Sequence, residues 1–115
     1  MSKRSEVEYI KDILKHMEKA ENFVKGCNYE EFTKNELLVC AVIRCIEVIG
    51  EAVKNLSKEL TGKYPDIPWK EMAGMRDFLI HKYYDVDLEI VWDTIKAEIP
   101  QAKPLIERVL IDIEG

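Results

Sequence analysis

Residues 37–60 read Leu-Leu-Val-Cys-Ala-Val-Ile-Arg-Cys-Ile-Glu-Val-Ile-Gly-Glu-Ala-Val-Lys-Asn-Leu-Ser-Lys-Glu-Leu, and their apolar positions recur at steps of three and four. This spacing is typical of an α-helix. The apolar stripe is broader than one buried face requires, which indicates a helix at the centre of a bundle, or one shared between the core and a partner chain. Thr33 and Glu36 form a capping-box pattern just before it, so we expect the longest helix to start there and to run to about Leu60.

The residues before this stretch predict a first helix. Ser5 can cap its first amides while Glu8 reaches back to the cap. Apolar residues then follow at helical spacing: Val7, Ile10, Ile13, Leu14, Met17, Ala20 and Val24. The pattern breaks over residues 26–32, where Gly26 suits a helix end.

Three more helices are expected after a loop at residues 61–68, which contains a glycine and two prolines. Pro68 stands near the start of the third helix, and Asp85 or Asp87 caps the fourth. Pro100 is expected to stop the fourth helix, and a last short helix should begin at about Lys103.

These patterns define the fold class. No segment alternates with period two for long enough to form a strand, and residues 1–115 fit one domain of common size. We therefore expect an all-α protein, an up-and-down bundle of four to five helices with short connections.

Composition limits the classes of function. The chain has 22 acidic and 17 basic residues and a formal charge of −5, which disfavours a basic surface that binds DNA or RNA along its length. No apolar run approaches the roughly 20 residues that span a bilayer, so no membrane partner is expected and the default location is the cytoplasm. The three cysteines, at unrelated spacings, predict neither a zinc site nor a disulfide framework.

Residues 76–83 read Arg-Asp-Phe-Leu-Ile-His-Lys-Tyr and form the candidate site. On a straight helix Asp77 and His81 share a face, whereas Arg76 and His81 lie about 140° apart. Arg76 would then reach His81 by bending, through a helix break, or from a partner chain. The alternative is a surface arginine and a histidine satisfied by Asp77.

An arginine and a histidine together suit phosphodiester chemistry. A guanidinium donates two parallel hydrogen bonds to phosphate oxygens, and an imidazole transfers protons near neutral pH. This chemistry requires no metal and no cofactor, and the chain has no Gly-rich phosphate loop. One histidine does not readily act as both acid and base, so a two-fold dimer would supply the second.

Arg44, Glu47 and Glu51 belong to a polar row on the helix at residues 33–60. The simpler interpretation is an exposed face of ion pairs worth a few tenths of a kcal/mol each. The alternative is that these three residues line a cleft beside the Arg76 segment.

The pattern Arg76-Asp77-x-x-x-His81-x-Tyr83 resembles the R-x-x-x-x-H-x-Y signature of the HepT family, the minimal HEPN-domain toxins paired with MNT-type nucleotidyltransferase antitoxins. Residues 41–52, 67–76 and 85–92 are also similar to the family pattern, so the resemblance covers most of the chain.

The resemblance implies a HEPN-like helical fold, a homodimer, and a metal-independent endoribonuclease site at the dimer cleft. Arg76 and His81 would be the catalytic pair, with Asp77 in support. Tyr83 would be the tyrosine that the antitoxin modifies with AMP, which would block RNA by bulk and negative charge. The chain would then be the toxin of a type VII toxin–antitoxin system, with RNA as its substrate.

Two other functions remain open from the sequence. The chain could be a non-catalytic helical partner of a nucleotidyltransferase, to which it presents its tyrosine. A small-nucleotide sensor is a third reading, for which the sequence offers no phosphate loop.

Overall fold

Side-chain caps set where the helices begin. The computed structural model describes residues 5–81 and 87–115, with the side chains of residues 5–75 and 87–115. Helix α1 (Glu6–Phe23) starts after Ser5, whose Oγ accepts a hydrogen bond from the Glu8 N–H at 3.2 Å, as predicted. It ends before Gly26, whose φ of 77° is a conformation that glycine adopts without strain.

The remaining elements follow in chain order. They are α2 (Tyr29–Lys34), α3 (Glu36–Lys54), α4 (Lys58–Gly62), α5 (Trp69–His81), α6 (Leu88–Asp93), the π-helical turn η2 (Thr94–Glu98) and α7 (Ile99–Glu114). No strand occurs within these described residues, which confirms the all-α class.

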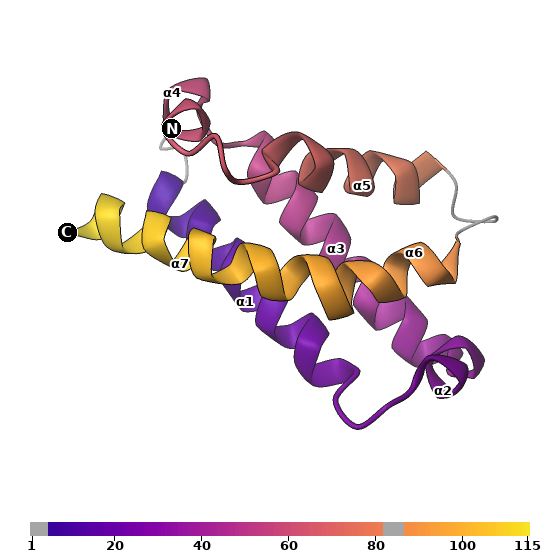
Figure 1. Ribbon diagram of the computed structural model, residues 1–115. Helices are drawn as coiled ribbons and strands as arrows, with labels where there is room; N and C mark the ends of the chain where they lie inside the picture. Colours follow the sequence, from indigo (N-terminus) through magenta and orange to yellow (C-terminus); the bar gives the residue numbers. More distant parts are fainter. Residues whose placement is uncertain (1–4, 82–86) are drawn as a thin grey trace.

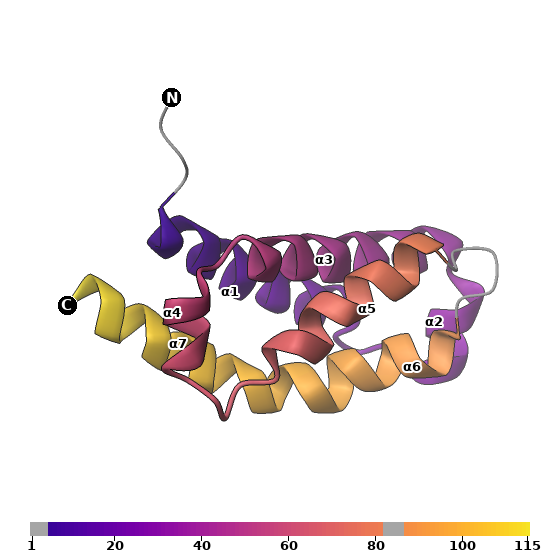
Figure 2. The ribbon, with the colours of Figure 1, turned by 90° about the horizontal axis from the view of Figure 1, so that it is seen from above.

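Four long segments form an up-and-down bundle: α1, α3, α5 and the rod made of α6, η2 and α7 (Figure 1). Helix α1 packs against both α3 and α7, and α3 packs against α5. Figure 2 shows α5 lying across the bundle between α3 and the α6–α7 rod. The short helices α2 and α4 close the two ends of α3.

A continuous apolar core holds these segments together. Phe32, Ile10, Ile13, Met17, Ile95 and Ile106 are its largest fully buried side chains. Burying a side chain of this size contributes about 1.5–3 kcal/mol to the free energy of folding. The ring of Phe32 lies 5.2 Å from that of Trp92, which joins α2 to α6.

The helix predicted from Thr33 to Leu60 is three helices. The capping box belongs to Asn28 and Glu31, which starts α2 earlier, and Asn35 then caps α3 by accepting from the Leu38 N–H. A second cap, Ser57, starts α4. The prediction was wrong at both ends because asparagine and serine side chains satisfy free amides that a longer helix would have bonded internally.

The predicted stop at Pro100 was also wrong. The rod passes through Pro100 because η2 is a π-turn, in which the Ile99 N–H bonds to the Thr94 carbonyl five residues back. Pro100 then occupies the first turn of α7, where a missing N–H costs little. The last helix therefore starts before Lys103 and includes Pro104 in its interior.

Candidate active site

The two catalytic candidates, Arg76 and His81, and the supporting Asp77 lie near the C-terminal end of α5. The backbone is helical without interruption from Arg76 to His81. No helix break separates the two positions, and they lie about 140° apart around the axis, while Asp77 and His81 share a face. The side chains of residues 76–81 lie outside the described part, as does Tyr83 altogether.

The start of α5 is held firmly. The Trp69 Nε1–H donates to the Tyr64 carbonyl at 3.0 Å, and Trp69 itself is buried. Ile67 is buried beside it. The Tyr64 hydroxyl donates in turn to Asp112 of α7 at 2.9 Å, so the loop before α5 is tied to the last helix.

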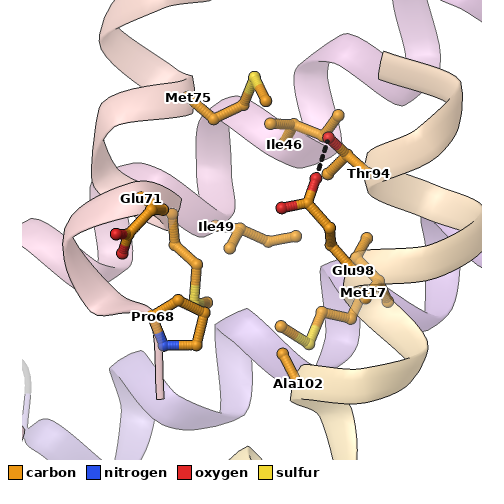
Figure 3. A pocket seen from close by; sticks show the side chains of 11 residues that line it. Met17, Ile46, Ile49, Pro68, Glu71, Met75, Thr94, Glu98 and Ala102 are labelled. Atoms are coloured by element: carbon orange, nitrogen blue, oxygen red, sulfur yellow. Dashed lines mark hydrogen bonds between the residues drawn. The ribbon is translucent and has the colours of Figure 1, made fainter. Parts of the chain in front are cut away.

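The packing of α5 on α3 determines which turns of the two helices lie side by side. Met72 and Met75 of α5 line the same cavity as Ile49 and Ile46 of α3 (Figure 3). Since the two helices run antiparallel, a residue further along α5 lies level with one earlier in α3 (Figure 2). At 1.5 Å per residue, Arg76 is level with the α3 turn that carries Arg44.

In the polar row on α3, which is Arg44, Glu47 and Glu51, the first two residues form an ion pair. The Arg44 guanidinium lies 3.8 Å from the Glu47 carboxylate, and these side chains are 75% and 25% exposed. Glu51 is exposed and lies one turn closer to α4 than Glu47. Of the three candidates on α3, Arg44 and Glu47 are therefore the ones closest along the helix axis to the Arg76 segment.

Glu47 is half-buried on α3, next to the buried Gly50 around the helix. Ile46 and Ile49 of the same helix line the cavity. Burial raises the pKa of the Cys45 thiol, and the charge of Lys19 opposes this.

A small cavity that the sequence did not reveal borders the same helix. It measures about 60 Å³ and lies between α5 and the η2–α7 part of the rod. Most of its lining side chains are apolar, Met17 and Ile46 among them, while Glu71 and Glu98 stand on opposite sides (Figure 3). The three-residue spacing of Met72 and Met75 was the one signal that they share a face.

The other histidine is remote from this region. His16 is half-buried on α1, and its Nδ1 lies 2.8 Å from the Asp12 carbonyl oxygen. His16 therefore does not join the His81 segment of its own chain.

Neither metal ligation nor membrane insertion is indicated by the described residues. No three His, Cys, Asp or Glu side chains gather there as a group that could hold a metal ion. No helix within residues 5–81 and 87–115 has both the length and the apolar character needed to cross a membrane.

Comparison with known proteins gives a consistent result. The model of the family described as "Ribonuclease HepT-like" matches residues 13–109. "Putative RNase MJ1216" of Methanocaldococcus jannaschii is 51% identical over 115 residues, which is 100% of this chain and 95% of that protein. "Putative RNase TTE0752" of Caldanaerobacter subterraneus is 46% identical over 102 residues, 89% of this chain and 91% of that protein.

A third relative carries the family's own name. "Probable ribonuclease HepT" of Thermococcus cleftensis is 42% identical over 107 residues, 93% of this chain and 97% of that protein. No solved structure matches the chain.

Proposed function

Because the chain belongs to the HepT-like ribonuclease family, we propose that it is a metal-independent endoribonuclease with Arg76 and His81 as its catalytic pair. The observation that carries this proposal is the family match, which spans residues 13–109 and so includes both positions. The unbroken helix from Arg76 to His81, level with Arg44 of α3, is compatible with it.

Each residue has a role that its chemistry suits. Arg76 binds the scissile phosphate through two hydrogen bonds and stabilises the negative charge that develops on it. His81 takes the proton from the ribose 2′-hydroxyl, whose oxygen attacks the phosphorus. The bond to the 5′-oxygen breaks, and that oxygen leaves with a proton from an acid. The products are a 2′,3′-cyclic phosphate and a 5′-hydroxyl.

Asp77 acts as a positioning residue. It stands four residues before His81 on the same face of α5, the spacing at which helical side chains meet. A carboxylate there orients the imidazole by accepting from one ring N–H, so that the other ring nitrogen faces the 2′-hydroxyl. On α3, Glu47 and Arg44 line the neighbouring edge of the cleft, and Glu51 extends the polar row away from it.

The working unit is a homodimer with its cleft at the two-fold axis. Proton transfer to the leaving oxygen needs a second acid, and His16 is held on α1 by the Asp12 carbonyl. A second copy supplies another His81 and another Arg76. This also concentrates positive charge on a protein whose formal charge is −5.

The biological role that fits this activity is the toxin of a type VII toxin–antitoxin pair. Its partner is an MNT-type nucleotidyltransferase that transfers AMP to Tyr83. An adenylyl group two residues from His81 adds bulk and negative charge beside a phosphate-binding site, so it excludes RNA.

The decisive experiment digests RNA in EDTA with wild type, Arg76→Ala and His81→Ala. Intact mass on the same samples reports whether the chain carries AMP, and peptide mass mapping locates it at Tyr83. We expect only unmodified wild type to cleave, leaving cyclic phosphate ends, with each variant at least 100-fold slower. Intact RNA after treatment with folded, unmodified wild type would refute the proposal.

The alternative function is a non-catalytic helical partner of the nucleotidyltransferase. Expression in growing cells separates the two. Toxicity that disappears in Arg76→Ala and His81→Ala supports the nuclease, whereas equal growth with all three proteins, together with tight binding to the nucleotidyltransferase, supports the binding partner.

A further inference from the structure

The cavity beside α5 combines an apolar surface with two carboxylates. Its lining includes the side chains of Ile46, Ile49 and Met75, and Glu71 and Glu98 stand on opposite sides of it (Figure 3). Both glutamates are exposed, so they lie where the cavity meets solvent. Among the described residues that line the cavity, these two are the only charged ones. The cavity therefore offers an apolar surface with negative charge on two sides.

We propose that this cavity binds a linear aliphatic diamine or polyamine, whose methylene chain lies on the apolar lining while its ammonium groups meet Glu71 and Glu98. A ligand with one charge would use only one carboxylate, and a neutral alkane would use neither. A metal ion is a poor match, since the described residues include no group of three His, Cys, Asp or Glu side chains that could hold one. A chain with a cation at each end matches both features of the cavity.

Glu98 is held beside the cavity by its own segment. Its Oε2 accepts a hydrogen bond from the Thr94 Oγ1 at 3.2 Å, and Figure 3 shows the carboxylate directed toward the cavity. Within residues 5–75 and 87–115, neither Glu98 nor Glu71 forms an ion pair with a lysine or an arginine. Both negative charges are therefore free to meet the ammonium groups of a ligand.

The volume of the cavity suits a narrow chain. At about 60 Å³ it is smaller than the roughly 150 Å³ that hold a benzene ring, so it has no space for an aromatic ring but accepts part of a methylene chain. Met17 and Met72 also line it, and methionine side chains adapt to apolar groups of different shape. Each methylene that leaves water for this surface is worth about a fourfold gain in affinity.

A bound diamine joins α5 to the rod. Glu71 stands in the first turn of α5, and Glu98 is the last residue of η2. In the described part of the chain α5 packs on α3, and the cavity separates it from the rod. The site exists only in the folded chain, so a ligand that binds there raises the temperature of unfolding in proportion to its occupancy.

The principal test is an NMR titration of protein labelled with ¹³C at its methionine methyl groups, at constant ionic strength. Met17, Met72 and Met75 all line the cavity, so their methyl signals report on its contents. Single Met→Leu variants assign these signals. We expect diaminobutane to shift the Met72 and Met75 signals to saturation, whereas butanediol, which has the same carbon chain without charge, should leave them unchanged at the same concentrations.

Charge variants test the two carboxylates. Glu71→Gln and Glu98→Gln should each raise the dissociation constant of diaminobutane about two- to fivefold, and the double variant should raise it by about the product of the two. Glu107→Gln is the matched control, because it removes the same charge at an exposed position of α7 that does not line the cavity. It should bind like wild type. All three positions are exposed, and circular dichroism checks that each variant folds.

Three results would overturn the site. Equal binding by wild type and the Glu71→Gln/Glu98→Gln double variant would show that the diamine is only a counterion of an acidic chain. Methionine signals that respond to butanediol as strongly as to diaminobutane would remove the role of charge. No shift at millimolar diaminobutane would show that the cavity does not accept the chain. None of these measurements involves RNA, so the diamine site and the nuclease stand or fall separately.

Discussion

Lys103 of α7 and Glu21 of α1 form an ion pair, with 3.0 Å between Nζ and Oε1, that joins the first and last long helices of the bundle. Their side chains are 27% and 30% exposed. The hydrogen bond to Glu21 raises the pKa of Lys103, while partial burial opposes the shift. The pair therefore contributes to stability wherever Lys103 is charged.

Lys103→Met should lower the free energy of unfolding by about 0.2–1 kcal/mol in urea denaturation at neutral pH. Because the folded pKa of Lys103 is raised, this contribution is full below the unfolded pKa of about 10.4 and is lost as pH rises through the folded value. Lys34→Met is the control, since Lys34 and Glu30 are 74% and 77% exposed. An equal loss in both variants would contradict the prediction.

The phenol of Tyr64 should lose its proton at a higher pH than an unperturbed tyrosine. Burial and the hydrogen bond to Asp112 raise the pKa of its phenol. Its contribution to stability is therefore full below the unfolded pKa of about 10 and falls as pH rises through the folded value. In an alkaline titration followed by tyrosinate absorbance, Tyr64→Phe should remove one of the later-titrating tyrosines. Removal of an early-titrating one would refute this.

The three cysteines should react with a thiol reagent in an order set by burial. Cys40 is exposed, Cys27 is half-buried, and Cys45 is buried with a raised pKa. Since the thiolate is the reactive form, Cys40 should react first and Cys45 last. Peptide mass mapping of partly alkylated native protein gives the order, and reaction in denaturant should equalise the rates.

Gly74 and Gly26 should respond oppositely to alanine. Gly74 lies inside α5 with no described atom within 4 Å of an added Cβ, so Gly74→Ala should stabilise the protein by about 0.5–1 kcal/mol. Gly26 has a φ of 77°, so Gly26→Ala should destabilise it by about 1–2 kcal/mol. Thermal unfolding distinguishes the two, and a destabilised Gly74→Ala would show that something contacts this position in the working protein.

Local signals in the sequence predicted several features correctly. Ser5 caps α1, Asp87 caps α6 by accepting from the Glu89 N–H, and Gly26 ends the first helical segment. Each of these depends on one side chain or one backbone conformation. The all-α class followed from helical spacing along the whole chain.

The start of a helix was harder to predict where two neighbouring residues could each act as its N-cap. The capping box was predicted at Thr33 and is instead at Asn28, at the start of the helix that buries Phe32 in the core. For the candidate site, the sequence left open a helix break between Arg76 and His81, and the backbone is helical from one to the other. The catalytic roles of these residues stay predictions.

The π-turn at Thr94–Glu98 amounts to one extra residue in an otherwise regular helix. That residue turns everything before it by about 100° relative to everything after it. One face of the rod therefore packs Trp92 against Phe32, and another face, after the turn, directs Ile99 and Ala102 to the cavity. Deleting a single codon within this turn would remove the π-turn through which the helix passes Pro100, and one of those two contact surfaces would then face water.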